Sequence, residues 1–355
     1  MTIADPVYFE KSHIETCRFD APAELAEQAV HCLELVAELS DAGLSYQFKG
    51  GNSLLLILKK PYRFSIDVDI ATDIPVGDIE EILDLCIQKY GAFTHWEPRR
   101  HKTKPWIPIS SYYLYYNSMF TDPPMTSIML DIQLRRSPYE TRFIPVVCGE
   151  LYQATVKAEL PTPASIIGDK LLTLGPDTLG IPTGKGKDAQ RLKHVCDVST
   201  LLDTEPDLDE IRASFFACME HENELQETAS SAGDVLDDTL FYCATAAQYA
   251  QKPEPTEEMP RRLIENITGI GPFAGHLFSK DYSWSKLQVD TARVALCITA
   301  VCTNKVNTPL FLDALSGKLQ PDQELIQNNQ LAETNDEAYR LWNSVAEWLG
   351  RNPLK

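Results

Sequence analysis

The sequence has few basic residues, no long apolar run and no paired cysteine motif, and each shortage excludes a class of protein. Its 32 Lys and Arg residues stand against 51 Asp and Glu residues, which gives a formal net charge of −19 at pH 7. Such a surface repels nucleic acid, so any RNA contact must be local. No apolar run approaches the roughly 20 residues that span a bilayer, and the N-terminus lacks a basic segment followed by an apolar one. We therefore expect a soluble cytoplasmic protein without a membrane partner.

Cysteine is present, but its spacing does not indicate disulfides or zinc. The nine cysteines are odd in number and scattered, and no two form a C-x-x-C pair. This usage is typical of a reducing compartment and argues against a zinc site. The 355 residues are 44% hydrophobic and contain no internal repeat or low-complexity tract, so the chain can form two domains, or one elaborated domain, with a proper core.

Two local basic segments are candidates for an RNA contact. One reads Arg99-Arg100-His101-Lys102 with Lys104 shortly after it. The other is a scattered set formed by Lys185, Lys187, Arg191 and Lys193. For both segments, a solvated loop face is the ordinary alternative.

The stretch 48–70 contains the most informative pattern. Gly50-Gly51-Asn52-Ser53 separates a predicted strand at 46–49 from a predicted short helix at 54–59. Because glycine accepts positive φ, this turn can direct backbone N–H groups at a phosphate, near the positive end of the following helix. The Ser53 hydroxyl is expected to face the same phosphate.

Polar and apolar residues alternate at 65–70, which predicts a strand. Its polar residues, expected on one face, are Ser65, Asp67 and Asp69, and its apolar residues, expected in the core, are Ile66, Val68 and Ile70. Two neighbouring carboxylates repel each other unless a cation lies between them. Hard oxygen ligands at an open site suit Mg²⁺ that carries nucleotide phosphates.

A third acid, Asp131, occupies a solitary position in the apolar strand predicted at 126–135. A buried carboxylate is costly there without a ligand, a base or a cation. Together, the glycine turn, the acid pair and the later acid predict metal-assisted nucleotidyl transfer, in which metal ions activate a hydroxyl and neutralise the departing pyrophosphate. Each motif alone has an ordinary alternative, since a Gly-Gly pair is usually a turn and an Asp-x-Asp strand is usually a solvated face.

The remaining pattern is helical at both ends of the chain. A helix at 21–42 is predicted to be amphipathic, with its acids off the apolar face: Glu24, Glu27, Glu34 and Glu38. Strands are expected within 93–147, and further helices at 76–90, 164–174, 208–222, 235–250, 257–268, 289–302, 308–315 and 336–349. The expected fold is therefore α/β, or α+β: a nucleotidyltransferase domain with a mixed sheet at 1–160, then a mainly helical domain at 161–355, with a cleft at their junction.

Two runs of residues also resemble a known family. They read Phe48-Lys49-Gly50-Gly51-Asn52-Ser53-Leu54 and Arg63-Phe64-Ser65-Ile66-Asp67-Val68-Asp69-Ile70. Together they resemble the signature of the AbiEii/AbiGii toxin family of nucleotidyltransferases, within the polymerase-beta-like superfamily. The resemblance continues at 130–132, 168–172, 177–182 and 191–198, and covers about 21–205. The chain departs from the family at Asn52-Ser53, where Thr-Ala is common, and at Cys196, where an aromatic residue is common.

The resemblance implies roles for individual residues. Asp67 and Asp69 correspond to the metal-binding pair, and Asp131 to the third acid, which serves as a base or metal ligand. Lys170 corresponds to an active-site lysine that can neutralise triphosphate charge. Asp197 corresponds to the last family acid, which holds Lys170 or orients the acceptor.

Each of these roles has a structural alternative. Lys170 could be an exposed helix lysine, and Asp197 could form an ion pair with Arg191 or Lys193. His194 is expected to be a surface or pairing residue. The residues expected to bind the nucleotide are Lys49, Gly50, Gly51, Ser53, Arg63 and Ser65.

The resemblance implies an enzyme that uses Mg²⁺ or Mn²⁺ and transfers a nucleoside monophosphate from a nucleoside triphosphate (NTP) to a hydroxyl. The expected acceptor is the 3′ end of tRNA, the output is blocked translation in toxin–antitoxin or phage defence, and the partner is a cognate antitoxin. Two alternatives stay open: modification of a protein or a small molecule such as an antibiotic, and a catalytically silent binding module. The intact acids and Lys170 weigh against a silent module, whereas the acidic surface favours an acceptor other than RNA.

Overall fold

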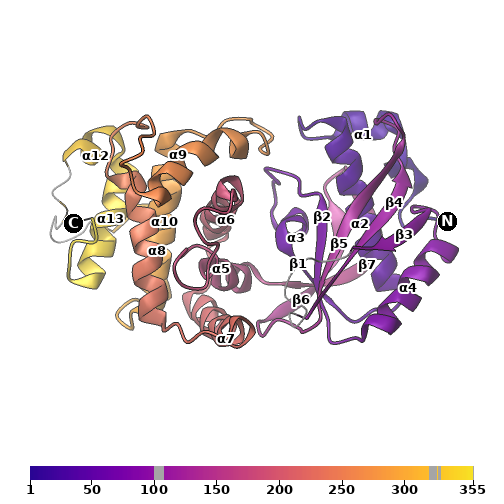
Figure 1. Cartoon of the computed structure of the whole chain (residues 1–355), viewed down its shortest axis with the longest axis horizontal. Helices are drawn as coiled ribbons and strands as arrows, with labels where there is room; N and C mark the ends of the chain where they lie inside the picture. The colour runs from indigo at the N-terminus through magenta and orange to yellow at the C-terminus, as the bar shows by residue number, and fades with distance from the viewer. Residues whose placement is uncertain (100–107, 320–325, 327–328, 355) are drawn as a thin grey trace. The chain divides into compact units, whose positions relative to one another are not determined.

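The computed structural model describes residues 1–99, 108–319, 326 and 329–354 (Figure 1). The chain forms two compact units. The N-terminal unit comprises Met1–Thr162 and a short later segment, His276–Ser279, and the helical unit comprises Pro163–Gly275 and Lys280–Lys355. The division falls two residues from the expected one, and the later segment departs from it.

A five-stranded mixed sheet forms the centre of the N-terminal unit. In spatial order its strands are β1 (Gln47–Lys49), β2 (Asp67–Ala71), β5 (Met125–Gln133), β4 (Ile109–Asn117) and β3 (His95–Pro98). β2 and β5 run parallel, and every other neighbouring pair is antiparallel. The expected α/β class with a mixed sheet is therefore confirmed.

Helices α2 (Ala23–Asp41) and α4 (Val76–Lys89) cover one face of this sheet (Figure 1). Val68 and Leu130 point into that face and are fully buried. At the far edge, the Trp96 indole donates a 2.9 Å hydrogen bond to Asp84 of α4. Because side chains alternate along a strand, the acids of β2 and β5 lie on the opposite face.

The other elements of the N-terminal unit pack around this core. They are a 3₁₀ turn (Pro6–Phe9), α1 (Lys11–Cys17), α3 (Gly50–Ile57), β6 (Thr141–Cys148) and β7 (Tyr152–Pro161). β6 and β7 form a separate antiparallel hairpin, and β7 packs on α2 and β1. The sequence pattern did not indicate β7.

The acids of α2 correct the amphipathic prediction. Glu27, Glu34 and Glu38 are buried rather than solvated. Glu27 accepts hydrogen bonds from Ser118 and the Met119 backbone N–H, and Glu34 accepts one from the Tyr152 hydroxyl at 2.6 Å. Neither Glu38 oxygen has a hydrogen-bond partner among the described residues, and burial followed by the charge of Glu34 raises the pKa of Glu38 to about 9. The helical spacing of apolar residues places these glutamates off the apolar face. It contains no information on the hydrogen-bond donors that other segments of the chain provide to the buried Glu27 and Glu34.

Two local predictions around the motif also need correction. Helix α3 begins at Gly50, so the glycine pair is its first turn and does not precede it. Strand β2 begins at Asp67, and Ile66 is 45% exposed rather than part of the core. The segment before β2 is therefore an extended connection outside the main sheet.

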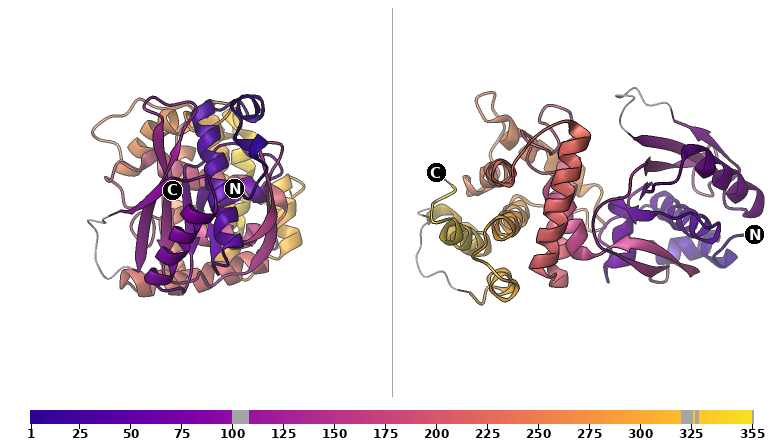
Figure 2. Two further views of the ribbon diagram at one scale, coloured as in Figure 1. Left: turned by 90° about the vertical axis from the view of Figure 1, so that its right-hand side faces the viewer. Right: turned by 90° about the horizontal axis from the view of Figure 1, so that it is seen from below.

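The second unit is helical, as expected. Its elements are α5 (Pro163–Leu171), α6 (Asp188–Leu201), a 3₁₀ turn (Leu202–Thr204), α7 (Leu208–Gln226), α8 (Ala232–Ala247), α9 (Arg261–Ala274), α10 (Trp284–Cys302), α11 (Thr308–Ser316), α12 (Asn329–Thr334) and α13 (Asp336–Leu349). α10 is buried along most of its length and packs against α8 and α13 (Figures 1 and 2). No described helix is long and apolar enough to cross a membrane.

Candidate active site

Strand register brings the predicted acids together on one face of the sheet. Asp69 of β2 lies opposite Lys49 of β1 and beside Asp131 of the parallel strand β5, and Asp131 lies opposite Ser111 of β4. Residues paired across neighbouring strands, which are about 4.8 Å apart, project from the same face. These four side chains therefore form a polar row across the sheet, and Asp67 lies on the same face two residues before Asp69.

The ends of this row are held by hydrogen bonds. The Lys49 ammonium donates to Gln133 Oε1 and to Ser137 Oγ, each at 3.2 Å. At the other end, the Ser111 hydroxyl donates a short hydrogen bond to the Asp131 carboxylate. Asp131 is thus oriented by a neighbouring strand and does not stand alone as the sequence suggested.

Gly50 places the beginning of helix α3 directly against the acids. Its φ is +71°, in the region that favours glycine. A β-carbon at Gly50 would lie only 1.8 Å from Asp69 Oδ2. Any other residue would therefore have to displace the Asp69 carboxylate.

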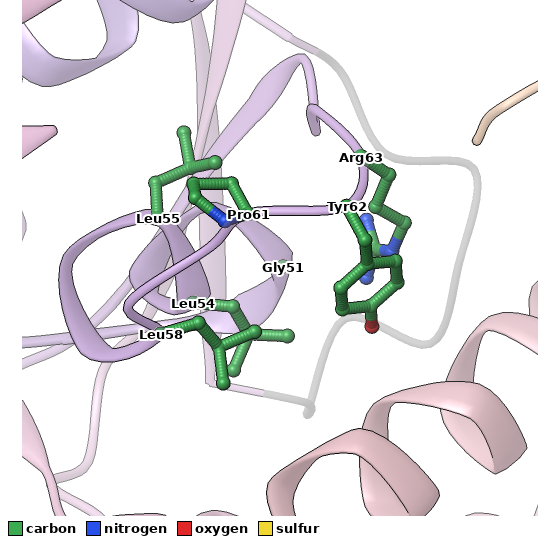
Figure 3. A pocket seen from close by; sticks show the side chains of 7 residues that line it. All are labelled: Gly51, Leu54, Leu55, Leu58, Pro61, Tyr62 and Arg63. Atoms are coloured by element: carbon green, nitrogen blue, oxygen red, sulfur yellow. The ribbon is translucent and has the colours of Figure 1, made fainter. Parts of the chain in front are cut away.

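Gly51 makes a second close approach. A β-carbon there would lie 3.0 Å from both Arg63 Nη1 and Ser65 Oγ. Arg63 is only 6% exposed, and its guanidinium points towards Gly51 and the Tyr62 ring (Figure 3). The first turn of α3 thus lies beside a guanidinium and a hydroxyl, which are groups that bind phosphate oxygens.

A small hollow also opens at this turn. It has an empty volume of about 160 Å³ and is lined by Gly51, Leu54, Leu55, Leu58, Pro61, Tyr62 and Arg63 (Figure 3). That space includes open solvent, and it leaves no enclosed room for even a water-sized sphere. The hollow is therefore a packing gap beside α3, too small to enclose a nucleotide.

Asn52 joins α3 to the segment that carries the acids, and the sequence analysis missed this role. Its side chain is fully buried; Nδ2 donates to the Asp67 carbonyl at 2.8 Å, and Oδ1 accepts from the Ser65 backbone N–H at 3.3 Å. The only signal in the sequence is an amide side chain two residues before the apolar run at 54–58.

The expectation that the Ser53 hydroxyl faces a phosphate is not met in this structure. Ser53 is fully buried, and its hydroxyl donates to the Gly50 carbonyl at 2.8 Å. Since α3 begins four residues earlier than expected, Ser53 lies within the helix and stabilises its first turn.

A cysteine thiol lies beneath the site. Burial and the nearby charge of Asp67 raise the pKa of Cys32 well above its usual value. This thiol therefore stays protonated and is not a nucleophile.

The carboxylates described on this sheet face are suitable ligands for a divalent metal, but they are not clustered closely enough to form a metal site as they stand. Among the described residues, no group of three or more His, Cys, Asp or Glu side chains is close enough to hold a metal ion. Carboxylates repel one another without a cation between them, so separation is their expected state. Asp67, Asp69 and Asp131 nevertheless offer carboxylate oxygens on one sheet face, which are the ligands that suit magnesium and manganese.

Lys170 and Asp197 form a buried ion pair within the helical unit. Lys170 of α5 and Asp197 of α6 are 2.9 Å apart between Nζ and Oδ2, and their side chains are 10% and 1% exposed. The alternative of an exposed helix lysine is therefore wrong. Arg191 was one alternative ion-pair partner for Asp197. Its guanidinium instead pairs with Glu265 at 2.5 Å.

Arg191 is only 1% exposed, so it does not belong to a surface that contacts RNA, contrary to the prediction for the second basic segment. In the other basic segment, Arg100, His101, Lys102 and Lys104 lie outside the described residues. Arg99 is described, and its guanidinium lies 6.0 Å from the centre of the Tyr113 ring.

A mixed sheet with two acids on one strand and a third on its parallel neighbour, beside a helix that begins with a glycine pair, defines a nucleotidyltransferase. The family model for the nucleotidyl transferase AbiEii toxin of type IV toxin–antitoxin systems matches residues 34–268, more than half of the chain. The protein belongs to this family. It is thus a nucleotidyltransferase of a toxin family, as its motifs indicated.

Individual relatives are remote. The comparison with curated proteins finds no match. Among solved structures, MenT4, a nucleotidyltransferase toxin from Mycobacterium tuberculosis, is 15% identical, with 82% of this chain and 96% of that chain covered and a TM-score of 0.47. An antigenic nucleotidyltransferase-like protein from Paracoccidioides brasiliensis is 12% identical, with 58% and 95% covered and a TM-score of 0.35.

Proposed function

We propose that the protein transfers a nucleoside monophosphate from an NTP to the 3′ end of tRNA, with Mg²⁺ or Mn²⁺ as cofactor, and so acts as the toxin of a toxin–antitoxin system. The observation that carries this proposal is the polar row on the sheet, in which Asp69 and Asp131 are neighbours on parallel strands. Family membership supports the reaction class.

The reaction breaks the phosphoanhydride bond between the α- and β-phosphates and forms a phosphodiester bond to the acceptor. An acceptor hydroxyl attacks the α-phosphorus of the NTP, the bond to the bridging oxygen breaks, and pyrophosphate leaves. Asp67, Asp69 and Asp131 would hold the metal, which supplies charge neutralisation and activation of the hydroxyl when bound. The first turn of α3 and Arg63 offer backbone N–H groups and positive charge to the phosphates.

The helical unit is proposed to contribute a cation. By the family pattern, Lys170 neutralises charge that develops on the departing pyrophosphate, and Asp197 orients it. The ion pair supports this assignment, because the 2.9 Å contact fixes the lysine side chain. A fixed cation stabilises developing charge without reorganising during the reaction.

Aromatic side chains near the acids support an RNA acceptor. β4 carries Tyr113 and Tyr115 on the same face of the sheet as Asp67. His95 stacks on Tyr115 with 4.4 Å between ring centres, and Arg99 lies over Tyr113. Tyr113 lies two strands from Asp67, or about 10 Å, and unpaired bases stack on such rings. The alternative acceptors, a protein or a small-molecule hydroxyl, have no matching feature among the described residues of this face.

The proposal is tested by offering the purified protein each labelled NTP with Mg²⁺ and, separately, total RNA or protein lysate from which RNA has been removed. Label in the tRNA fraction supports the proposal. Label that appears only in protein or in small molecules would replace the acceptor, and binding of NTP without transfer to any pool would favour a silent module.

A further inference from the structure

One short segment between two helices of the helical unit belongs to the N-terminal unit. Between α9 and α10, residues His276–Ser279 belong to the N-terminal unit, although they follow Thr162 by more than a hundred residues. We call this segment the strap.

The strap pairs with the extended connection that leads into β2. The Phe278 backbone N–H donates to the Tyr62 carbonyl at 3.0 Å, and Leu277 forms an antiparallel bridge with Arg63. Leu277 is 8% exposed. The strap therefore pairs through a single β-bridge with the extended connection, which lies outside the main sheet.

Aromatic packing fixes the same contact. The Phe278 ring stacks on Phe19 with 5.7 Å between centres and an interplanar angle of 6°. It also meets the edge of Phe64 at 4.8 Å and 66°. Phe64 lies between Arg63 and Ser65, so the position of Phe278 determines where both neighbours can lie.

The connection is held from its other side by α3. Asn52 accepts a hydrogen bond from the Ser65 N–H, and Gly51 provides the space that Arg63 and Ser65 occupy. The guanidinium that faces the first turn of α3 thus depends on two supports, one adjacent in sequence and one supplied by the strap. Removing the strap contacts would leave the extended connection held from the side of α3.

We propose that the strap is a positioning element for the donor nucleotide, in which Phe278 and Leu277 hold Arg63 over the first turn of α3. This inference rests on the proposed function, because it assigns Arg63 to the triphosphate. The proposal also assigns a role to α9 and α10, because the strap connects these two helices.

The informative variant is Phe278→Ala, with Phe278→Leu as the conservative rescue. Phe278→Ala should raise the KM for NTP by about tenfold or more, with kcat at saturation changed less than about threefold. Phe278→Leu should recover most of this affinity. In the background of Arg63→Ala, the strap substitution should add little, because the two residues act through one group.

A matched control separates positioning from general loss of stability. Phe311 of α11 is fully buried in the helical unit, so Phe311→Ala removes the same side chain from the core of the other unit. It should lower thermal stability without raising the KM for NTP. Hydrogen exchange gives a readout that does not need activity: in Phe278→Ala, peptides over 62–66 should exchange faster than in the wild type.

The outcomes distinguish the two proposals. If the wild type transfers label but Phe278→Ala keeps both its KM and its exchange rate at 62–66, the strap has no positioning role. If KM rises equally in Phe278→Ala and Phe311→Ala, the effect is general instability and the inference is overturned. If the wild type transfers no label while exchange at 62–66 still rises in Phe278→Ala, the strap holds the segment but the proposed function fails, and with it the role in nucleotide binding.

Discussion

The buried pair Lys170–Asp197 allows the structural and catalytic roles of one lysine to be separated. Its two charges are 2.9 Å apart, and the aspartate side chain is only 1% exposed. Lys170→Met would remove the ammonium that lies 2.9 Å from this buried carboxylate, and breaking a buried ion pair typically costs about 3–5 kcal/mol. At about 2–4 °C per kcal/mol for a unit of this size, the melting temperature should fall by roughly 6–20 °C.

The double variant Lys170→Met/Asp197→Leu removes both charges. Replacement of a buried ion pair by apolar side chains of similar size is often close to neutral, so the double variant should regain most of the lost stability. Transfer should not return with it. We expect turnover at saturating substrates to stay reduced by about 100-fold or more, as when one preorganised electrostatic group is removed elsewhere.

Lys286→Met is the matched control, because Lys286 also pairs with a buried aspartate of the helical unit, Asp290, at 2.9 Å. Thermal unfolding is measured on all variants. Transfer from labelled NTP is measured at a temperature below all of their melting temperatures. The control should lose stability but keep its turnover. The reasoning is refuted if the double variant recovers transfer together with stability, since Lys170 would then act only through the fold.

Three further predictions concern the N-terminal unit. Gly50→Ala should abolish transfer with little loss of circular dichroism, because its φ is +71° and its β-carbon would meet the Asp69 carboxylate; Gly77→Ala, which has open space around it, is the control. Burial raises the pKa of Glu38 to about 9 from its usual 4.5, so the folded state keeps a proton that the unfolded state loses. The unfolding free energy should therefore fall between pH 5 and 9 by at most about 1.4 kcal/mol per pH unit, and Glu38→Gln should flatten this slope in urea titrations. Tyr113→Ala should raise the KM for tRNA about 5- to 100-fold, as loss of one stacked base does, and leave the KM for NTP unchanged; an equal change in both constants would contradict a stacking role.

The sequence predicted the parts of the site that depend on local spacing. Alternation at 65–70 places Asp67 and Asp69 on one face, because the period of a strand is two residues. The same reasoning failed for Ile66, since the strand begins at Asp67, two residues later than predicted. Element boundaries depend on hydrogen bonds to other segments, which local spacing does not contain.

The contacts that complete the site come from distant segments. The position of Asp131 beside Asp69 follows from the parallel register of β2 and β5, which the sequence pattern does not specify. Nothing in the alternation of residues around Phe278 indicates pairing with Tyr62. Both contacts link residues more than fifty positions apart, where pattern and propensity give no information.

The most direct test of the central claim is the rate at which Asp69→Asn transfers label from NTP at saturating Mg²⁺. Asp78→Asn, an exposed change at the start of α4, is the control. The account predicts that Asp69→Asn retains its fold and loses transfer by about 100-fold or more, while the control matches the wild type. Retention of more than about a tenth of the wild-type turnover, a barrier increase below about 1.4 kcal/mol, would contradict a reaction centred on these acids.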